Sequence, residues 1–214
     1  MLDLPLQSAV LNILLHLVYS VPCDRYNPSL DTISAVFPAL KVYGYSAQSM
    51  IPPHPDFSQV MIFHAPGDPL RVYALAASAS LEALAVAASH FTLVTSLSSV
   101  TDALAAQMGP HYLRRLFFLH LGRVEALKLH LMSPPDMHES TPDCDFTEQK
   151  KLTRAWALAT AYLAWDGRPD ASPASLSASL TPLVEHLQCR PCRDLLQGRI
   201  LTLIQNWSLV KTTI

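Results

Sequence analysis

Apolar residues recur at intervals of three and four along almost the whole chain, and this spacing constrains the fold more than any other feature. Val10, Leu11, Leu14, Leu15 and Val18 follow it near the start, which places them on one face of an α-helix. Similar stretches continue to the end of the sequence, and no segment shows the apolar–polar alternation typical of β-strands. We therefore expect an all-α fold, arranged as a multi-helix bundle or array.

Residues that favour helix ends divide this pattern into separate helices. Ser29 is a suitable N-cap for a helix that Gly44 ends. Asp68 followed by a proline favours another helix start. A further helix is expected to stop at Gly109 and Pro110, because proline lacks the amide hydrogen that continues a helix.

Two proline-rich segments indicate how the chain is organised. Residues 46–69, which contain IPPHP and APGDP, predict a boundary between an N-terminal unit, 1–65, and a helical extension, 66–214. Within the extension we expect helical hairpins over 66–132. The loop SPPDMHESTPDC then leads to a C-terminal helical region over 145–214.

The composition excludes several classes of function. Only 15% of the 214 residues are charged and the net charge is -2, so there is no basic surface of the kind that binds nucleic acid. The basic doublets at 114–115 and 150–151 are interpreted as solvated helix edges. The sequence contains no phosphate-binding loop, no dinucleotide glycine motif and no GxSxG. We expect neither an enzyme nor a small-molecule substrate.

The apolar runs, the cysteines and the low charge content also predict the cellular location of the protein and the character of its surface. The longest nearly apolar run, VLNILLHLVY, has about half of the ~20 residues that span a bilayer, so no membrane segment is predicted. The start, MLDLPLQS, lacks the basic flank of a secretory leader. Four cysteines in such a chain suggest free thiols and an intracellular protein, cytoplasmic or nuclear. With so few charges, some apolar surface must be exposed or covered by a partner.

The cysteines offer the one candidate for metal chemistry. Cys189 and Cys192 form a CxxC in HLQCRPC, a spacing that can present two thiolates to one tetrahedral zinc ion. Cys144 and His186 can complete the ligand set if the loop from Ser133 to Cys144 folds back. The favoured interpretation is that these cysteines pack as small buried side chains, with a zinc- or redox-responsive site as the alternative. A thioredoxin-like role for CRPC is disfavoured because no βαβ context is predicted.

Short motifs connect the chain with a known family. Near the N-terminus, Leu14, Leu15, Val18 and Tyr19 match an apolar helix of the LLxxxYxG kind, and Ala39, Leu40, Tyr43 and Gly44 match the helix after it. A third group follows in RVYALAASASLEALAVAASHF: Val72, Tyr73, Ala74, Ala76, Leu81, Leu84 and Ala87. In this order the motifs resemble the latter half of a BTB/POZ domain and the helices after it. The tail, with Cys144, Trp156, Trp165 and the CxxC, resembles the helical C-terminal region of a large fungal group of BTB proteins.

The resemblance implies a fold and a role. Residues 1–65 would be the C-terminal half of a BTB-like domain, because nothing upstream of Ser8 can supply the strand-rich first half, and 66–214 would be a BACK-like extension. The implied function is a non-enzymatic protein–protein interaction module, as a scaffold, a ubiquitin-ligase adaptor or a transcription-related partner. Protein partners, self-association included, are then expected on the first helix, at Val10, Leu11, Leu14, Leu15, Val18 and Tyr19. Apart from the zinc alternative, no cofactor is expected.

Overall fold

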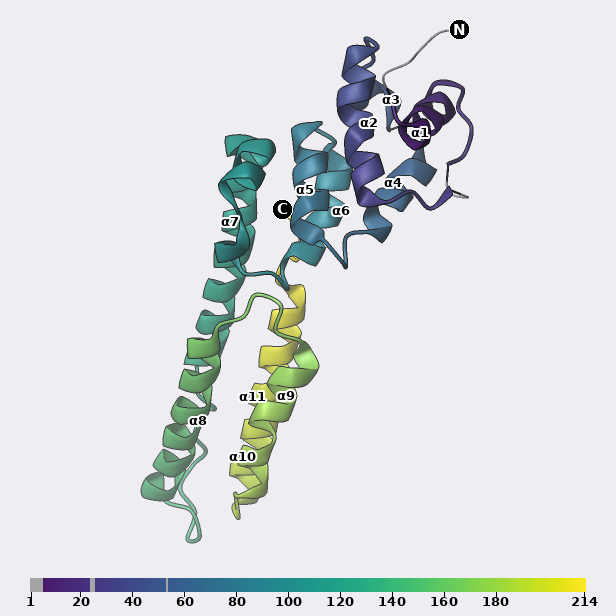
Figure 1. Cartoon of the computed structure of the whole chain (residues 1–214). Helices are drawn as coiled ribbons and strands as arrows, with labels where there is room; N and C mark the ends of the chain where they lie inside the picture. The colour runs from purple at the N-terminus through teal and green to yellow at the C-terminus, as the bar shows by residue number, and fades with distance from the viewer. Residues whose placement is uncertain (1–5, 24–25, 53) are drawn as a thin grey trace, which may run out of the picture. The chain divides into compact units, whose positions relative to one another are not determined.

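The computed structural model describes residues 6–23, 26–52 and 54–214, and this part of the chain is helical (Figure 1). It contains no β-strand; an isolated bridge joins Thr141 and Cys144. The predicted all-α fold is confirmed. Pro53 of the predicted connector lies outside the described residues. The helices are α1 Ser8–Val18, α2 Leu30–Val42, α3 Ala47–Met50, α4 Pro55–Phe63, α5 Pro69–Ser78, α6 Glu82–Thr92, η2 Leu97–Ser99, α7 Asp102–Met132, α8 Phe146–Asp166, α9 Pro173–Leu180, α10 Pro182–Glu185 and α11 Arg190–Leu209.

The chain forms two compact units. Unit 1 comprises Met1–Phe118 and Thr212–Ile214, and unit 2 comprises Leu119–Lys211. Helix α7 contributes residues to both. The predicted division near residue 65 falls inside unit 1, where α4 packs against α6. The boundary near residue 65 stays a prediction about family domains. The contacts within the chain place the division between the two units after Phe118.

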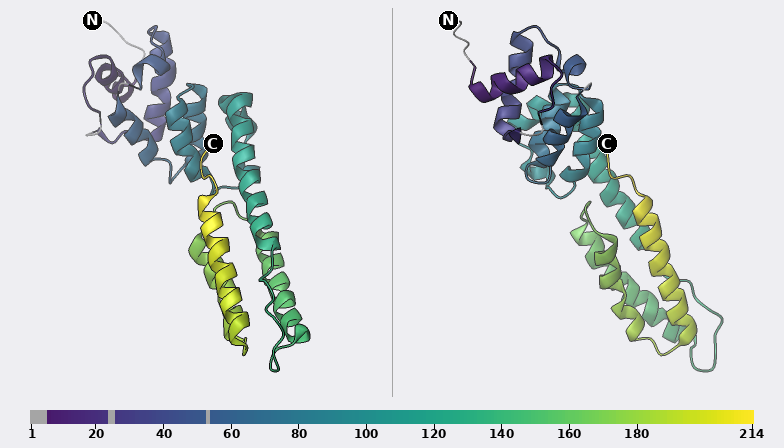
Figure 2. Two further views of the ribbon diagram at one scale, coloured as in Figure 1. Left: turned by 180° about the vertical axis from the view of Figure 1, so that it is seen from behind. Right: turned by 90° about the vertical axis from the view of Figure 1, so that its right-hand side faces the viewer.

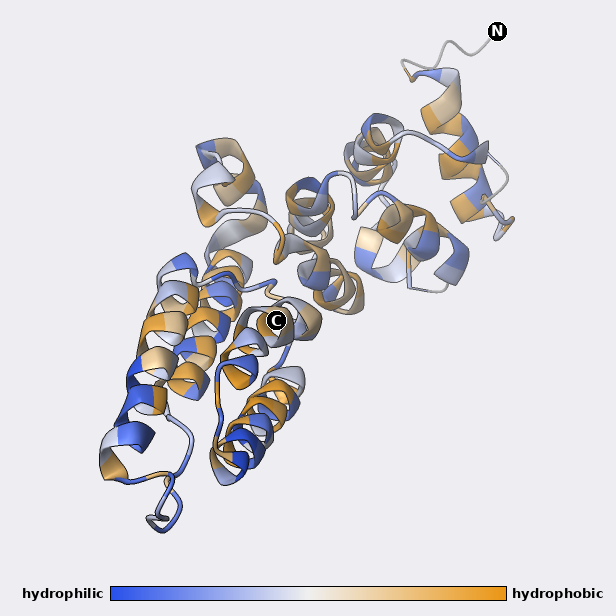
Figure 3. Ribbon diagram, turned by 90° about the horizontal axis from the view of Figure 1, so that it is seen from below, coloured by the Kyte–Doolittle hydropathy of each residue, from blue (hydrophilic) through white to orange (hydrophobic). Residues whose placement is uncertain are grey.

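Unit 1 contains two closely packed pairs of helices. Helices α1 and α2 pack together, as do α5 and α6, and α5 is enclosed on nearly all sides because its centre consists of small and apolar residues. The expected capping residues act as such: the Ser29 side chain accepts a hydrogen bond from the Thr32 N–H, and Asp68 accepts one from Arg71 N–H. Figure 3 shows that hydrophobic residues follow individual faces of the helices, as the three-and-four spacing predicted.

Helix α7 is interrupted where the sequence predicted a stop. Gly109 has φ 70° and ψ 166°, which is outside the helical region, and Pro110 follows it. A residue with a side chain adopts a positive φ only at a cost, so glycine suits this position. The chain then resumes its helical course to Met132.

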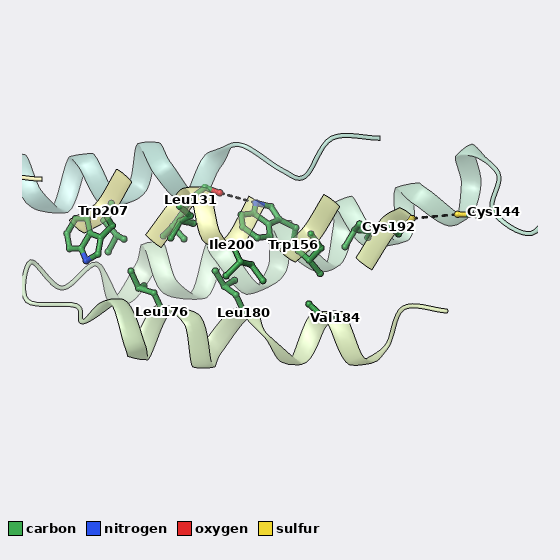
Figure 4. Packing of buried hydrophobic residues seen from close by; sticks show 13 residues of the cluster. Leu131, Cys144, Trp156, Leu176, Leu180, Val184, Cys192, Ile200 and Trp207 are labelled. Atoms are coloured by element: carbon green, nitrogen blue, oxygen red, sulfur yellow. Dashed lines mark hydrogen bonds between the residues drawn. The ribbon is translucent and has the colours of Figure 1, made fainter. Parts of the chain in front are cut away.

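Unit 2 is built from elongated helices around one apolar core, and α9 packs against both α8 and α11 (Figure 2). The indole nitrogens of two buried tryptophans donate hydrogen bonds to backbone carbonyls: Trp156 to Leu131 and Trp207 to Ala171. Figure 4 shows Trp207 near one end of this core and Cys144 at the other. The buried core residues are Leu127, Leu131, Cys144, Leu152, Trp156, Leu176, Leu180, Val184, Cys192, Leu196, Ile200, Leu203 and Trp207.

Among the described residues, no helix combines the length and the apolar character required to cross a membrane.

Candidate metal centre

The CxxC lies at the start of helix α11. Cys189 is the N-cap residue and Cys192 belongs to the first turn, with a proline between them. Since one helical turn brings residues three apart onto the same side, both sulfurs face the same point. Pro191 fits here because the amides of the first turn have no partner within the helix. The local sequence thus sets the position of two candidate ligands.

The other two candidate ligands come from the loop between α7 and α8, residues 133–145. Thr141 and Cys144 exchange backbone hydrogen bonds of 3.0 and 3.1 Å, which turn the chain sharply. The buried side chain of Gln149 holds the loop at a second point: its Oε1 accepts from the His138 N–H and its Nε2 donates to the His138 carbonyl, both at 3.1 Å. The loop therefore folds back onto α11.

Four side-chain atoms converge as a result. The Nε2 atom of His138 and the Sγ atoms of Cys144, Cys189 and Cys192 all lie within 4.8 Å of one another. His138 Nε2 is 3.2 Å from Cys192 Sγ and 3.3 Å from Cys189 Sγ. The two buried sulfurs, of Cys144 and Cys192, are 3.7 Å apart (Figure 4).

These distances are close to the edges of a zinc tetrahedron. Zinc–sulfur bonds of ~2.3 Å place two ligand sulfurs about 3.8 Å apart, and a zinc–nitrogen bond of ~2.0 Å places nitrogen about 3.5 Å from sulfur. The Cys144–Cys192 separation of 3.7 Å matches the first value. The two sulfur–nitrogen separations, 3.2 and 3.3 Å, need only a few tenths of an ångström of expansion. Three thiolates and one imidazole form one of the common structural zinc ligand sets.

The orientation of the His138 ring also suits a ligand. Its Nδ1 lies 2.6 Å from the carbonyl oxygen of Glu139. Because a carbonyl only accepts, Nδ1 carries the proton and donates it, which leaves a lone pair on Nε2 pointing toward the three sulfurs. A backbone carbonyl that fixes the tautomer in this way is the usual outer contact of a metal-bound histidine.

The thiols differ in their electrostatic surroundings. Burial raises the pKa of Cys192 to about 12 and also raises the pKa of Cys144. The pKa of Cys189 is lowered, chiefly because the backbone N–H of Cys192 hydrogen-bonds its sulfur at the helix N-terminus. Without a metal, three sulfurs in close contact disfavour deprotonation of more than one, whereas a divalent cation stabilises all three as thiolates.

The structure brings together three of the four residues predicted as ligands and replaces the fourth. Cys144, Cys189 and Cys192 are in the cluster, but the histidine is His138. His186 is the exposed C-cap residue of α10, a position that ends a short helix on the surface. The expectation that His186 belongs to the site is therefore corrected, because the loop that delivers Cys144 also delivers His138.

The predicted partner-binding helix is largely packed within unit 1. Val10 and Leu14 are buried, and Leu11 and Val18 are half-buried. Of the six residues, Leu15 and Tyr19 are exposed. Contact with a partner through this helix stays a prediction.

Comparison with protein-family models, with curated proteins and with solved structures gives no match. The fold and the site define an all-α protein whose second unit carries a cluster of three cysteines and one histidine. The chemistry of this centre therefore has to follow from its own geometry.

Proposed function

We propose that this chain is a zinc protein in which one ion, held by His138, Cys144, Cys189 and Cys192, has a structural role. The observation that carries the proposal is the convergence of one imidazole nitrogen and three sulfurs within 4.8 Å of one another. Soft thiolates in a tetrahedral arrangement favour zinc over magnesium, calcium or manganese, which take oxygen ligands.

The number of protein ligands supports a structural role over a catalytic one. Catalytic zinc sites have three protein ligands and leave one position for water or substrate. Here the protein can supply all four ligands, and Cys144 and Cys192 are buried. Zinc bound in this way has no open position at which to activate a water molecule.

The position of the ligands indicates which part of the fold a bound ion would stabilise. Two ligands come from the loop 133–145, which has no helix of its own, and loops of this length usually need additional contacts to be ordered. The other two come from the start of α11. Zinc would therefore join the loop after α7 to the last helix of unit 2 and close one end of the apolar core (Figure 4).

Metal analysis of the 214-residue chain, purified without chelator, tests the proposal. We expect one zinc per chain, and loss of that zinc in His138→Asn. His186→Asn is the matched control, because it removes the histidine beside the CxxC that lies outside the cluster. Cobalt substitution should also give the intense visible absorption of a tetrahedral thiolate site. Zinc-free protein, or equal metal content in the two histidine variants, would contradict the proposal.

Cysteine variants separate a zinc site from simple packing of thiols. Cys189→Ser and Cys192→Ser should each reduce zinc affinity strongly, whereas Cys23→Ser should not. Cys23 is also buried but lies in unit 1, where its N–H and sulfur contact the carboxylate of Asp56. If all three variants bind zinc as the wild type does, the cysteines are packing residues only.

A further inference from the structure

The outer face of helix α8 carries large apolar side chains that nothing in unit 2 covers. Leu158, Tyr162 and Trp165 are 76%, 74% and 92% exposed, and their spacing of four and three places them in one row. We call these three residues the α8 ridge. Trp156, on the opposite face of the same helix, is 1% exposed. Tryptophan is usually highly buried, so the exposure of Trp165 indicates a contact surface.

A groove runs beside the α8 ridge. Its volume is about 460 Å³. On the α8 side the lining includes Ala157, Ala161 and Ala164, and on the α7 side Leu131 and Met132. An alanine stands one position before each residue of the α8 ridge. Its small side chain leaves space beside the ridge, and this space is part of the groove. A groove of this kind accepts bulky side chains from another helix.

The charges along α8 have opposite signs at its two ends. Arg154 lies one turn before the α8 ridge and Asp166 directly after it, and both are exposed. Lys150 and Lys151 add to the basic end, although Lys151 forms an ion pair with Glu148. A helix with this distribution is complementary to itself when a second copy runs antiparallel.

We propose that the α8 ridge and groove form a self-association surface, occupied by α8 of a second copy in an antiparallel, two-fold arrangement. With the axis between Ala161 and Tyr162, Leu158 faces Trp165 of the second copy. Each ridge then enters the groove of the other copy, and each Arg154 approaches the second copy's Asp166. A two-fold contact requires one surface to supply both complementary halves, and α8 does so.

The size of the surface sets the expected strength. From Arg154 to Asp166 the face is ~20 Å long. A stable dimer interface buries about 800 Å² on each partner, and one helix face of this length provides a smaller area. Self-association should therefore be weak and concentration-dependent. The contact lies within unit 2, and the inference does not depend on whether zinc is bound.

Sedimentation velocity of the 214-residue chain over a wide concentration range tests the proposal. We expect a monomer–dimer equilibrium that Leu158→Arg weakens by roughly tenfold or more, because a charge would enter an apolar contact. Leu209→Arg is the matched control: Leu209 is 84% exposed on α11, and its replacement should leave the equilibrium unchanged. Both positions are exposed, so circular dichroism should show both variants folded.

A charge exchange provides the second test. Arg154→Asp and Asp166→Arg should each weaken the dimer, because each places two like charges together, and the double variant should restore it. A wild-type protein that is monomeric at every concentration overturns the proposal. Equal effects of Leu158→Arg and Leu209→Arg on dimerisation would also overturn it. The same holds if the double charge variant dimerises no more strongly than the two single variants.

Discussion

Replacement of Cys144 by serine removes one of the four ligands and should release the ion, which destabilises unit 2 by an amount that the chain topology sets. Through the ion, Cys144 is joined to Cys189, about 45 residues further along the chain, and a cross-link that closes a loop of this size contributes about 4 kcal/mol through chain entropy. Arg199 limits the structural damage, because it binds the Ser133 carbonyl at 2.8 Å and holds the loop start without the metal. We therefore expect a loss of about 4 kcal/mol with the helices retained.

Tryptophan fluorescence measures this loss in unit 2 alone. All three tryptophans of the chain, at 156, 165 and 207, lie in that unit. For a unit of this size, the loss corresponds to a fall in melting temperature of roughly 15–30 °C. A chelator should lower the wild-type melting temperature similarly and have no effect on Cys144→Ser. Cys23→Ser changes a buried cysteine of unit 1 and should leave this melting temperature unchanged. If chelation leaves the melting temperature of the wild type unchanged, the proposal that zinc has a structural role is wrong.

Four further predictions concern the scaffold. Gly167→Ala should cost about 1–2 kcal/mol, because Gly167 has φ +39° and its Cβ would lie 3.0 Å from a backbone oxygen. Gly198→Ala, in the open middle of α11, should instead gain about 0.5–1 kcal/mol, and urea denaturation measures both. Arg123→Met should cost about 3–5 kcal/mol in the same assay, because buried Arg123 donates hydrogen bonds to three backbone carbonyls. Burial pushes the pKa of Asp56 upward, but hydrogen bonds from Cys23 outweigh it and the pKa is lowered. The resulting stabilisation is present at neutral pH and is lost as the pH falls through the lowered pKa. The difference in melting temperature between the wild type and Asp56→Asn should therefore shrink on acidification; a constant difference would refute this.

The helices were predictable because their signals are local. The three-and-four spacing, the caps at Ser29 and Asp68 and the break at Gly109 each depend on a few neighbouring residues. The division into two units was not predictable in this way. It depends on which helices pack together over long sequence distances, and a proline-rich connector does not show that α4 returns to pack against α6.

The candidate site was predictable in part, for a similar reason. The two sulfurs of the CxxC are close because of their spacing alone, but the choice between His138 and His186 depends on the course of a loop. That course is determined by the buried side chain of Gln149, which binds both backbone groups of His138. A glutamine eleven residues after a histidine is no recognisable motif. Nearness in sequence to the CxxC favoured His186, which the end of α10 leaves on the surface.

The low charge content of the sequence required some apolar surface to be exposed, and the structure shows where a large part of it lies. Helix α1 buries Val10, Ile13, Leu14 and Leu17 against its own unit. Helix α8 has apolar residues on two opposite faces, and the unit 2 core covers only the face that carries Trp156. A helix that is apolar on both faces is normally enclosed on both. The uncovered face of α8 therefore exposes aromatic surface, at Tyr162 and Trp165, that a second macromolecule would remove from water. Self-association should be sought there first.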